Sequence, residues 1–161
     1  ETFLMTNIAP QTPRLNRQWW ARLEQLVARE YAEFFQEVWV IVGPVYMENN
    51  TWIREAVQVP SHYFKIIKVE VDGELWMKAF LVPQDLAKGE APEPYLTTVK
   101  EIESLTGLNF NPVLQTALAD SLENIRLTRL WDLQPADLAL STSACLDGIC
   151  MELAGMEAAE E

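Results

Sequence analysis

The most regular hydrophobic pattern in the sequence follows the pair Thr12–Pro13. Apolar residues recur every three or four positions across residues 14–34, the spacing that places them on one face of an α-helix. Thr12 is a suitable N-cap and Pro13 suits the first helical position, while Asn16 is a second candidate cap. The pattern therefore predicts a long amphipathic helix over residues 14–34.

Runs of β-branched and aromatic residues predict an antiparallel sheet. Residues 37–42 predict a buried strand that ends in a turn at Gly43–Pro44. Residues 62–71 and 74–82 flank Asp72–Gly73, the strongest short hairpin signal in the chain. We expect these two segments to pair as antiparallel strands.

Short helices and polar loops are predicted for the next part of the chain. A helix over residues 98–106 opens with the capping-box spacing T-V-K-E and ends at Gly107. Residues 112–125 predict another helix, and exposed loops are expected over residues 47–58 and 84–94.

These elements, together with a short strand expected over residues 3–8, predict an α+β fold in which helices pack on an antiparallel sheet. Residues 1–125 are expected to form the main domain, and residues 126–161 a C-terminal extension with a frayed acidic tail. Cys145 and Cys150 lie in this extension without the spacing of a zinc site, which leaves a local disulfide or two buried thiols as the readings.

Composition and charge limit the classes of protein to which the chain can belong. The chain has 161 residues, 49% of them hydrophobic, which is enough for one core. Its 12 basic and 24 acidic residues give a net charge of −12, which opposes general attraction to nucleic acid or to an anionic membrane. The longest apolar run, over residues 38–42, is far too short to span a bilayer. Charge by itself therefore favours an acidic soluble binding protein.

The long helix carries the one suggestive arrangement of polar residues. Asn16, Trp20 and Glu24 are spaced i, i+4 and i+8, which places them on one side of the helix. An amide oxygen and a carboxylate, reinforced by water, suit a hard cation such as Mg²⁺. The structural alternative is that Asn16 caps the helix and Glu24 lies on its solvated face. Spacing alone leaves both readings open.

A longer stretch of sequence favours the metal-binding reading of Asn16 and Glu24. Residues 6–24, T-N-I-A-P-Q-T-P-R-L-N-R-Q-W-W-A-R-L-E, closely resemble the signature of the DNA/RNA non-specific endonucleases of the ββα-metal (His-Me finger) superfamily. Further segments match this family in the same order: V-W-V-I-V-G-P-V-Y at residues 38–46, V-P-S-H-Y-F-K-I-I at 59–67, K-A-F-L-V-P at 78–83 and T-V-K-E-I-E-S-L-T-G-L at 98–108. The resemblance implies a ββα-metal nuclease fold, an antiparallel sheet flanked by helices.

The resemblance also implies roles for individual residues. Asn16 takes the place of the metal-binding asparagine and Glu24 that of the catalytic glutamate, which holds metal-bound water around a single Mg²⁺ or Mn²⁺ ion. Asn7 and Gln11 match the N-x-x-P-Q turn that buttresses the site. Two arginines of the same helix are candidates for binding the substrate: Arg22 and Arg29.

The chain departs from the family pattern in two ways. The family's general base is a histidine in an Asp-Arg-Gly-His stretch well before the N-x-x-P-Q motif, and this chain begins six residues before Asn7. The base and the N-terminal strand are therefore expected upstream of this sequence, since His62, the only histidine, matches a sheet position with a structural role. Ala28 stands where the family often carries an arginine, and Arg29 follows one residue later.

The sequence thus leads to two hypotheses of function. The first is a metal-dependent, sugar-non-specific endonuclease that hydrolyses DNA or RNA, in which this chain supplies the metal-binding helix and an upstream segment or a second chain completes the fold. The alternative is a catalytically inactive nuclease-like subunit that serves as an interaction module, as a homodimer or in a larger assembly. The absent base, Ala28 and the net charge of −12 favour the alternative. The two-cysteine ending favours a mitochondrial location over a periplasmic or secreted one.

Overall fold

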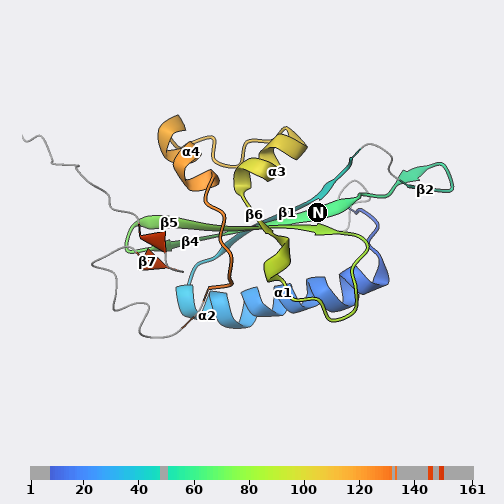
Figure 1. The fold of residues 1–161 in the computed structure, drawn as a ribbon, viewed down its shortest axis with the longest axis horizontal. Helices are drawn as coiled ribbons and strands as arrows, with labels where there is room; N and C mark the ends of the chain where they lie inside the picture. The colour runs from blue at the N-terminus through green and yellow to red at the C-terminus, as the bar shows by residue number, and fades with distance from the viewer. Residues whose placement is uncertain (1–7, 48–50, 132, 134–144, 147–148, 151–161) are drawn as a thin grey trace, which may run out of the picture.

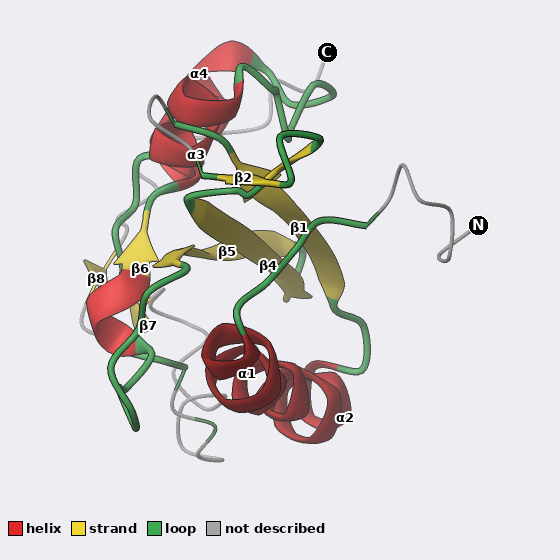
Figure 2. Ribbon diagram, turned by 90° about the vertical axis from the view of Figure 1, so that its right-hand side faces the viewer, coloured by secondary structure: helices red, strands yellow, loops and turns green. Residues whose placement is uncertain are grey.

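The long helix and the two short helices cover opposite faces of one antiparallel sheet (Figure 1). The structure is a computed structural model that describes residues 8–47, 51–131, 133, 145–146 and 149–150. The strand predicted over residues 3–8 falls outside this range except for Ile8, as does most of the predicted extension. A view along the helix shows the three layers, with the long helix below the sheet and α3 and α4 above it (Figure 2).

The predicted helix over residues 14–34 is confirmed as one continuous rod from Pro13 to Phe35. Two wide π-helical stretches, η2 (Leu15–Trp20) and η3 (Val27–Tyr31), alternate with α1 (Ala21–Leu26) and α2 (Ala32–Phe35). The predicted N-cap is also confirmed, because the Thr12 hydroxyl accepts a hydrogen bond from the Leu15 N–H at 3.3 Å. The rod ends at Gln36, whose positive φ of 66° turns the chain toward the sheet.

The central sheet has the order β1-β4-β5-β6 with antiparallel neighbours throughout. The predicted hairpin is confirmed: Asp72 and Gly73 both have positive φ, as a two-residue turn between twisted strands requires. The short strand that pairs with the second strand of this hairpin, residues 96–97, was not predicted. The four strands are β1 (Trp39–Val45), β4 (His62–Val71), β5 (Glu74–Pro83) and β6 (Leu96–Thr97).

The prediction of a buried first strand that ends at Gly43–Pro44 is wrong on two points, because β1 continues to Val45 and, of its residues, Val45 alone is fully buried. Pro44 is tolerated because β1 lies at the edge of the described sheet, where a missing N–H removes no hydrogen bond from a second neighbour. Gly43 serves packing, since a Cβ atom built there would lie 2.6 Å from the ring of its cross-strand neighbour Phe64. The glycine thus admits an aromatic ring that any other residue would displace.

Smaller elements differ from the predictions mainly in length. The expected loop over residues 47–58 is exposed but contains a short hairpin, β2 (Trp52–Ile53) and β3 (Val57–Gln58). The predicted cap and end of the next helix are confirmed in α3 (Val99–Thr106). The last helix, α4 (Thr116–Glu123), is shorter than predicted because residues 111–114 form a turn instead.

Two further short elements complete the description. A single 3₁₀ turn, η4 (Glu93–Tyr95), closes the otherwise irregular loop that the sequence predicts over residues 84–94. Near the C-terminus, β7 (Cys145–Leu146) pairs with β8 (Ile149–Cys150), so the two cysteines stand opposite each other in the backbone register.

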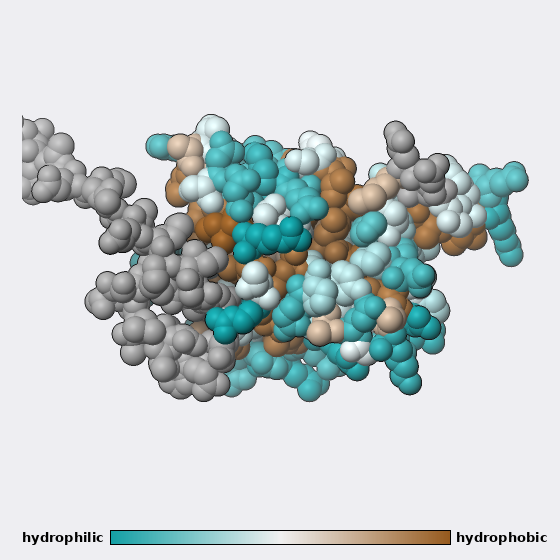
Figure 3. Space-filling model, viewed as in Figure 1, coloured by the Kyte–Doolittle hydropathy of each residue, from teal (hydrophilic) through white to brown (hydrophobic). Residues whose placement is uncertain are grey.

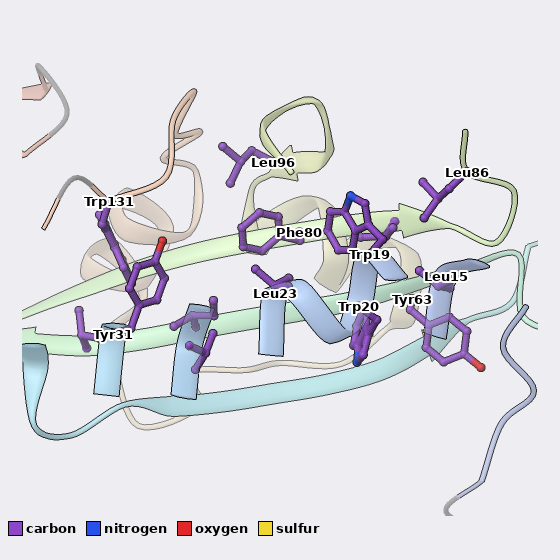
Figure 4. Close-up of a cluster of buried hydrophobic side chains, with 14 residues drawn as sticks. Leu15, Trp19, Trp20, Leu23, Tyr31, Tyr63, Phe80, Leu86, Leu96 and Trp131 are labelled. Atoms are coloured by element: carbon purple, nitrogen blue, oxygen red, sulfur yellow. The ribbon is translucent and has the colours of Figure 1, made fainter. Parts of the chain in front are cut away.

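The hydrophobic core is divided by the sheet into two clusters. The larger one joins the long helix to β4 and β5, and its tryptophans point to different strands: Trp19 packs edge-on against Phe80, and Trp20 against Tyr63 (Figure 4). The chain after Ile125 also enters this cluster, because the centre of the Trp131 ring lies 5.1 Å from the centre of the Tyr31 ring. The smaller cluster lies under α3 on the opposite face.

Apart from Leu105, Leu108, Val113 and Leu118 around α3 and α4, exposed apolar residues gather at two places on the described surface. One is the β2–β3 hairpin, where Trp52, Ile53 and Val57 are each about half exposed, and hydrophobic residues are visible beside it in Figure 3. The other is the edge strand β1, with Val40 and Val42. Within the described part of the chain, no helix has the length and apolar character needed to cross a membrane.

Gly43→Ala tests the close approach of Phe64. We expect the substitution to lower the free energy of unfolding by about 1–3 kcal/mol, because the new methyl group overlaps the ring. Urea denaturation of the variant and of the double variant Gly43→Ala/Phe64→Leu measures this, and the double variant should recover part of the loss. Equal stability of Gly43→Ala and the wild type would contradict the packing.

Candidate active site

The candidate site lies on the side of the long helix that faces β4. Asn16 and Glu24 are exposed, and Trp20 between them is buried with only 6% of its surface accessible. Asn16, Trp20 and Glu24 follow one another at intervals of four residues, about one helical turn each, so the two exposed side chains lie on the same side of the helix, one turn before and one turn after Trp20.

The reading of Asn16 as a helix cap does not hold. Thr12 provides the cap, and the Asn16 backbone N–H donates to the Thr12 carbonyl at 2.9 Å, one turn into the helix. The Asn16 side chain thus lies on the exposed surface of the second turn, where capping cannot account for it.

Glu24 has a partner that the sequence did not indicate. The Nζ atom of Lys65, on β4, lies 4.0 Å from the Glu24 carboxylate and 4.5 Å from the centre of the Trp20 ring. Lys65 itself is buried, with 2% of its surface exposed. A lysine in an otherwise apolar strand segment, F-K-I-I, is the one signal that could have drawn attention to it.

The ionisation of Lys65 reflects this environment. Burial lowers the pKa of Lys65 to about 8, and the nearby Glu24 carboxylate opposes that shift. The dominance of burial means that the charged ammonium is held in place at the expense of folding stability. A charge retained under such conditions is typical of functional sites.

The loop that leads into the helix is fixed from the sheet. Gln84, at the end of β5, accepts from the Thr12 N–H at 2.9 Å and donates to the Pro10 carbonyl at 2.7 Å, and the Tyr63 hydroxyl donates to that same carbonyl at 3.0 Å. Gln11, expected to buttress the site, is half-buried in this loop. Asn7, its expected companion, lies outside the described residues.

The arginines of the helix face different surroundings. Arg22 lines a cleft of about 320 Å³ with Trp19 and residues 89–92, on the β5 side of the helix, whereas Glu24 contacts β4. Arg29 is exposed in η3. The structure therefore does not bring Arg22 to the same side of the helix as Glu24.

His62 makes a contact that supports a structural role. Its Nδ1 atom lies 3.1 Å from the Ser61 hydroxyl, and partial burial lowers the pKa of the imidazole. No group of three or more His, Cys, Asp or Glu residues within the described ranges could hold a metal ion.

Comparison with known proteins places the chain in a family. A family model described as DNA/RNA non-specific endonuclease matches residues 1–117. The chain belongs to the DNA/RNA non-specific endonuclease family. The α+β fold and the family predicted from the sequence are thereby confirmed.

The similarity to named relatives extends over most of this chain but over only part of each relative. The chain is 30% identical to human mitochondrial endonuclease G over 78% of its length and 46% of that protein. It is 32% identical to the human mitochondrial nuclease EXOG over 88% of the chain and 43% of that protein. It is 31% identical to a nuclease from Nostoc sp. over 76% of the chain and 49% of that protein. The chain thus spans slightly less than half the length of these family members.

Lys65→Met tests how the buried charge of Lys65 affects the free energy of unfolding. We expect the variant to be as stable as the wild type or more stable at pH 7, because an apolar side chain of similar length needs no desolvated charge. The folded-state pKa of about 8 lies below the ordinary value of 10.5, so the unfolded chain binds more protons between these pH values. Wild-type stability should therefore rise relative to the variant from pH 8 to 10.5.

Urea denaturation at pH 7 and pH 10 measures both effects. Lys88→Met, at an exposed lysine, serves as the control and should show neither. A Lys65→Met variant that is less stable by more than about 1 kcal/mol at pH 7, the scale of an ordinary favourable ion pair, would contradict the prediction.

Proposed function

We propose that the protein is a metal-dependent, sugar-non-specific endonuclease and that this chain carries its metal-binding helix. The observation that supports this most is the shared face of Asn16 and Glu24. The two side chains flank Trp20 on a helix that Thr12, Gln84 and the core hold in place. A fixed helix gives these polar groups a defined direction, which a catalytic site requires.

Asn16 is the proposed ligand of a single Mg²⁺ or Mn²⁺ ion. Its exposed amide supplies one neutral oxygen, a ligand type that hard cations accept, and its position leaves room for water on the solvent side. When bound, such an ion stabilises the negative charge that develops on a phosphodiester as it is hydrolysed. The donor set of this helix fits Mg²⁺ better than a soft metal such as Zn²⁺, which prefers thiolate and imidazole.

Glu24 is the proposed catalytic carboxylate. One side of it faces Lys65, and the side chain is 60% exposed, so its oxygens can accept hydrogen bonds from water beside Asn16. The carboxylate can thereby orient water within the site. The general base is proposed to be a histidine of an upstream segment.

Arginines give the helix a basic surface within an acidic chain. The helix from Pro13 to Phe35 carries four arginines and three carboxylates, and its part up to Arg29 holds all four arginines with Glu24 as the one carboxylate, although the chain as a whole carries a net charge of −12. Arg22 and Arg29 are exposed and are proposed to contact the phosphate backbone of DNA or RNA. The local charge of this helix, rather than the net charge of the chain, determines attraction of a polyanion at short range because salt screens distant charges.

The free edge of β1 is the proposed contact for a further strand. Within the described residues β1 pairs with β4 alone, and its exposed face carries Val40 and Val42 beside Lys65. An apolar strand edge of this kind pairs readily with another strand. We propose that an upstream segment of the same protein pairs with residues 39–43 of this edge, short of Pro44, and brings the histidine to the site.

Cleavage of plasmid DNA and of RNA by the full-length protein with Mg²⁺ tests the proposed function. We expect Asn16→Ala to lower the rate by more than about 100-fold, because even loss of an outer-shell partner of a metal site commonly costs 10- to 100-fold. Gln25→Ala removes an exposed amide from the same helix and is the matched control, with a rate close to that of the wild type. Chelation of the metal should abolish cleavage.

Two results would contradict this proposal. If the wild type cleaves neither DNA nor RNA, the protein is an inactive nuclease-like subunit instead. If Asn16→Ala and the wild type cleave equally, Asn16 holds no catalytic metal.

Hydrogen exchange tests the proposed strand pairing. We expect amides of residues 39–43 to exchange at least 10-fold more slowly in the full-length protein than in residues 1–161 alone, because a second strand protects those N–H groups that β4 leaves open. Amides of the central strand β4 serve as the internal reference. Protection that instead grows with the concentration of residues 1–161 would assign the edge to a second copy of the chain.

A further inference from the structure

Three lysines of the sheet have little exposed surface, and two of them have a clear structural task. Lys68 donates to the Phe110 carbonyl at 2.8 Å and thereby ties the loop after α3 to β4. Lys78 donates to the Arg129 carbonyl and lies 4.9 Å from the centre of the Trp131 ring, which anchors the segment after α4. Both lysines satisfy the backbone of a neighbouring loop.

Lys65 differs from these two lysines in what it contacts. Its partners are side chains of the long helix, the ring of Trp20 at 4.5 Å and the carboxylate of Glu24 at 4.0 Å. Trp20 and Glu24 are one turn apart, so the ammonium lies beside two successive positions of the proposed active-site face. No loop is anchored by these contacts.

The pair of Lys65 and Glu24 is asymmetric in its exposure. The Lys65 side chain is 3% exposed and the Glu24 side chain 60%. The ammonium therefore lies behind the carboxylate, on the side of the sheet, while the carboxylate reaches solvent. With so little exposed surface, Lys65 cannot itself contact a phosphodiester or its attacking water.

The neighbours of Lys65 show that an apolar residue would fill its place. Its cross-strand partners are Val42 on β1 and Phe80 on β5, and Ile67 follows it on the same face of β4. One turn beyond Glu24, Ala28 offers the carboxylate no charge from the helix itself. Lys65 is thus the cation that the fold places against Glu24.

We propose that Lys65 is a positioning residue that orients the Glu24 carboxylate in the active site. The proposal rests on the proposed function, since it assigns Glu24 a task in hydrolysis. Trp20 holds the ammonium through its ring face, and the ammonium holds one carboxylate oxygen toward the sheet. The other oxygen is left to face water and the substrate. Without this anchor an exposed glutamate samples several rotamers.

Steady-state cleavage by the full-length protein tests this role. We expect Lys65→Met to lower kcat by about 10- to 100-fold with KM changed by less than about threefold, because a supporting partner is lost and no substrate contact is removed. Lys65→Arg keeps the charge and should restore part of kcat. In a Glu24→Gln background, Lys65→Met should cause no further loss, because the two residues act as one unit.

Lys78→Met is the matched control for burial. It removes a second buried lysine that lies over a tryptophan on the same face of the sheet, but one that contacts the C-terminal segment instead of Glu24. We expect it to lower stability while kcat, measured below the unfolding transition, stays close to that of the wild type. A loss of kcat equal to that of Lys65→Met would show a general effect of core disruption and overturn the proposal.

A second measurement tests the contact without catalysis. NMR titration of the Lys65 side chain, labelled at Cε, should show a lower pKa in Glu24→Gln than in the wild type, because the carboxylate favours the charged ammonium. Glu30→Gln, an exposed glutamate of the same helix, should leave it unchanged.

The outcomes separate the two proposals. A wild type that cuts no nucleic acid overturns the proposed function, and the role of Lys65 with it. A wild type that cuts, together with Lys65→Met at the same kcat or an unchanged Lys65 pKa in Glu24→Gln, overturns the role of Lys65 alone.

Discussion

The packing of the long helix against β4 and β5 is the constraint on which the rest of the structure depends. Trp19 and Trp20 occupy adjacent positions and contact different strands, which fixes the rotation of the helix about its axis. Fully burying large apolar side chains stabilises a fold by several kcal/mol in sum, so this rotation is strongly determined. Because the rotation is fixed, Glu24 takes a defined place on the side toward β4, and Arg22 takes the other side.

The candidate site is built where the core meets solvent. Trp20 belongs to both, since its ring packs against Tyr63 and also covers the ammonium of Lys65. The same helix face thus provides apolar area for folding and polar groups for chemistry. The cost of holding a charged lysine there is offset by the surrounding apolar contacts, which do not depend on its ionisation. Family membership gives the chain its context, that of the DNA/RNA non-specific endonucleases.

Prediction from the sequence was most accurate where structure is determined locally. The helix from Thr12, the hairpin at Asp72–Gly73 and the capped helix α3 follow from capping, turn geometry and periodicity, and all three are confirmed. The prediction that β1 ends at Gly43–Pro44 was wrong for a non-local reason. Whether glycine and proline interrupt a strand depends on its neighbours, here an open edge and the ring of Phe64.

The sequence by itself determined the family, the α+β class and the helix that carries Asn16 and Glu24, because motifs and periodic patterns are local properties of the chain. Only the tertiary structure decided what stands behind Glu24. Lys65 lies far from Glu24 in sequence, and the two meet because β4 passes beside the helix at this turn. The tertiary structure also distinguished the roles of the three lysines of the sheet. Their sequence contexts look alike, but their contacts differ. A contact between distant segments depends on the relative placement of both elements, which no local pattern encodes.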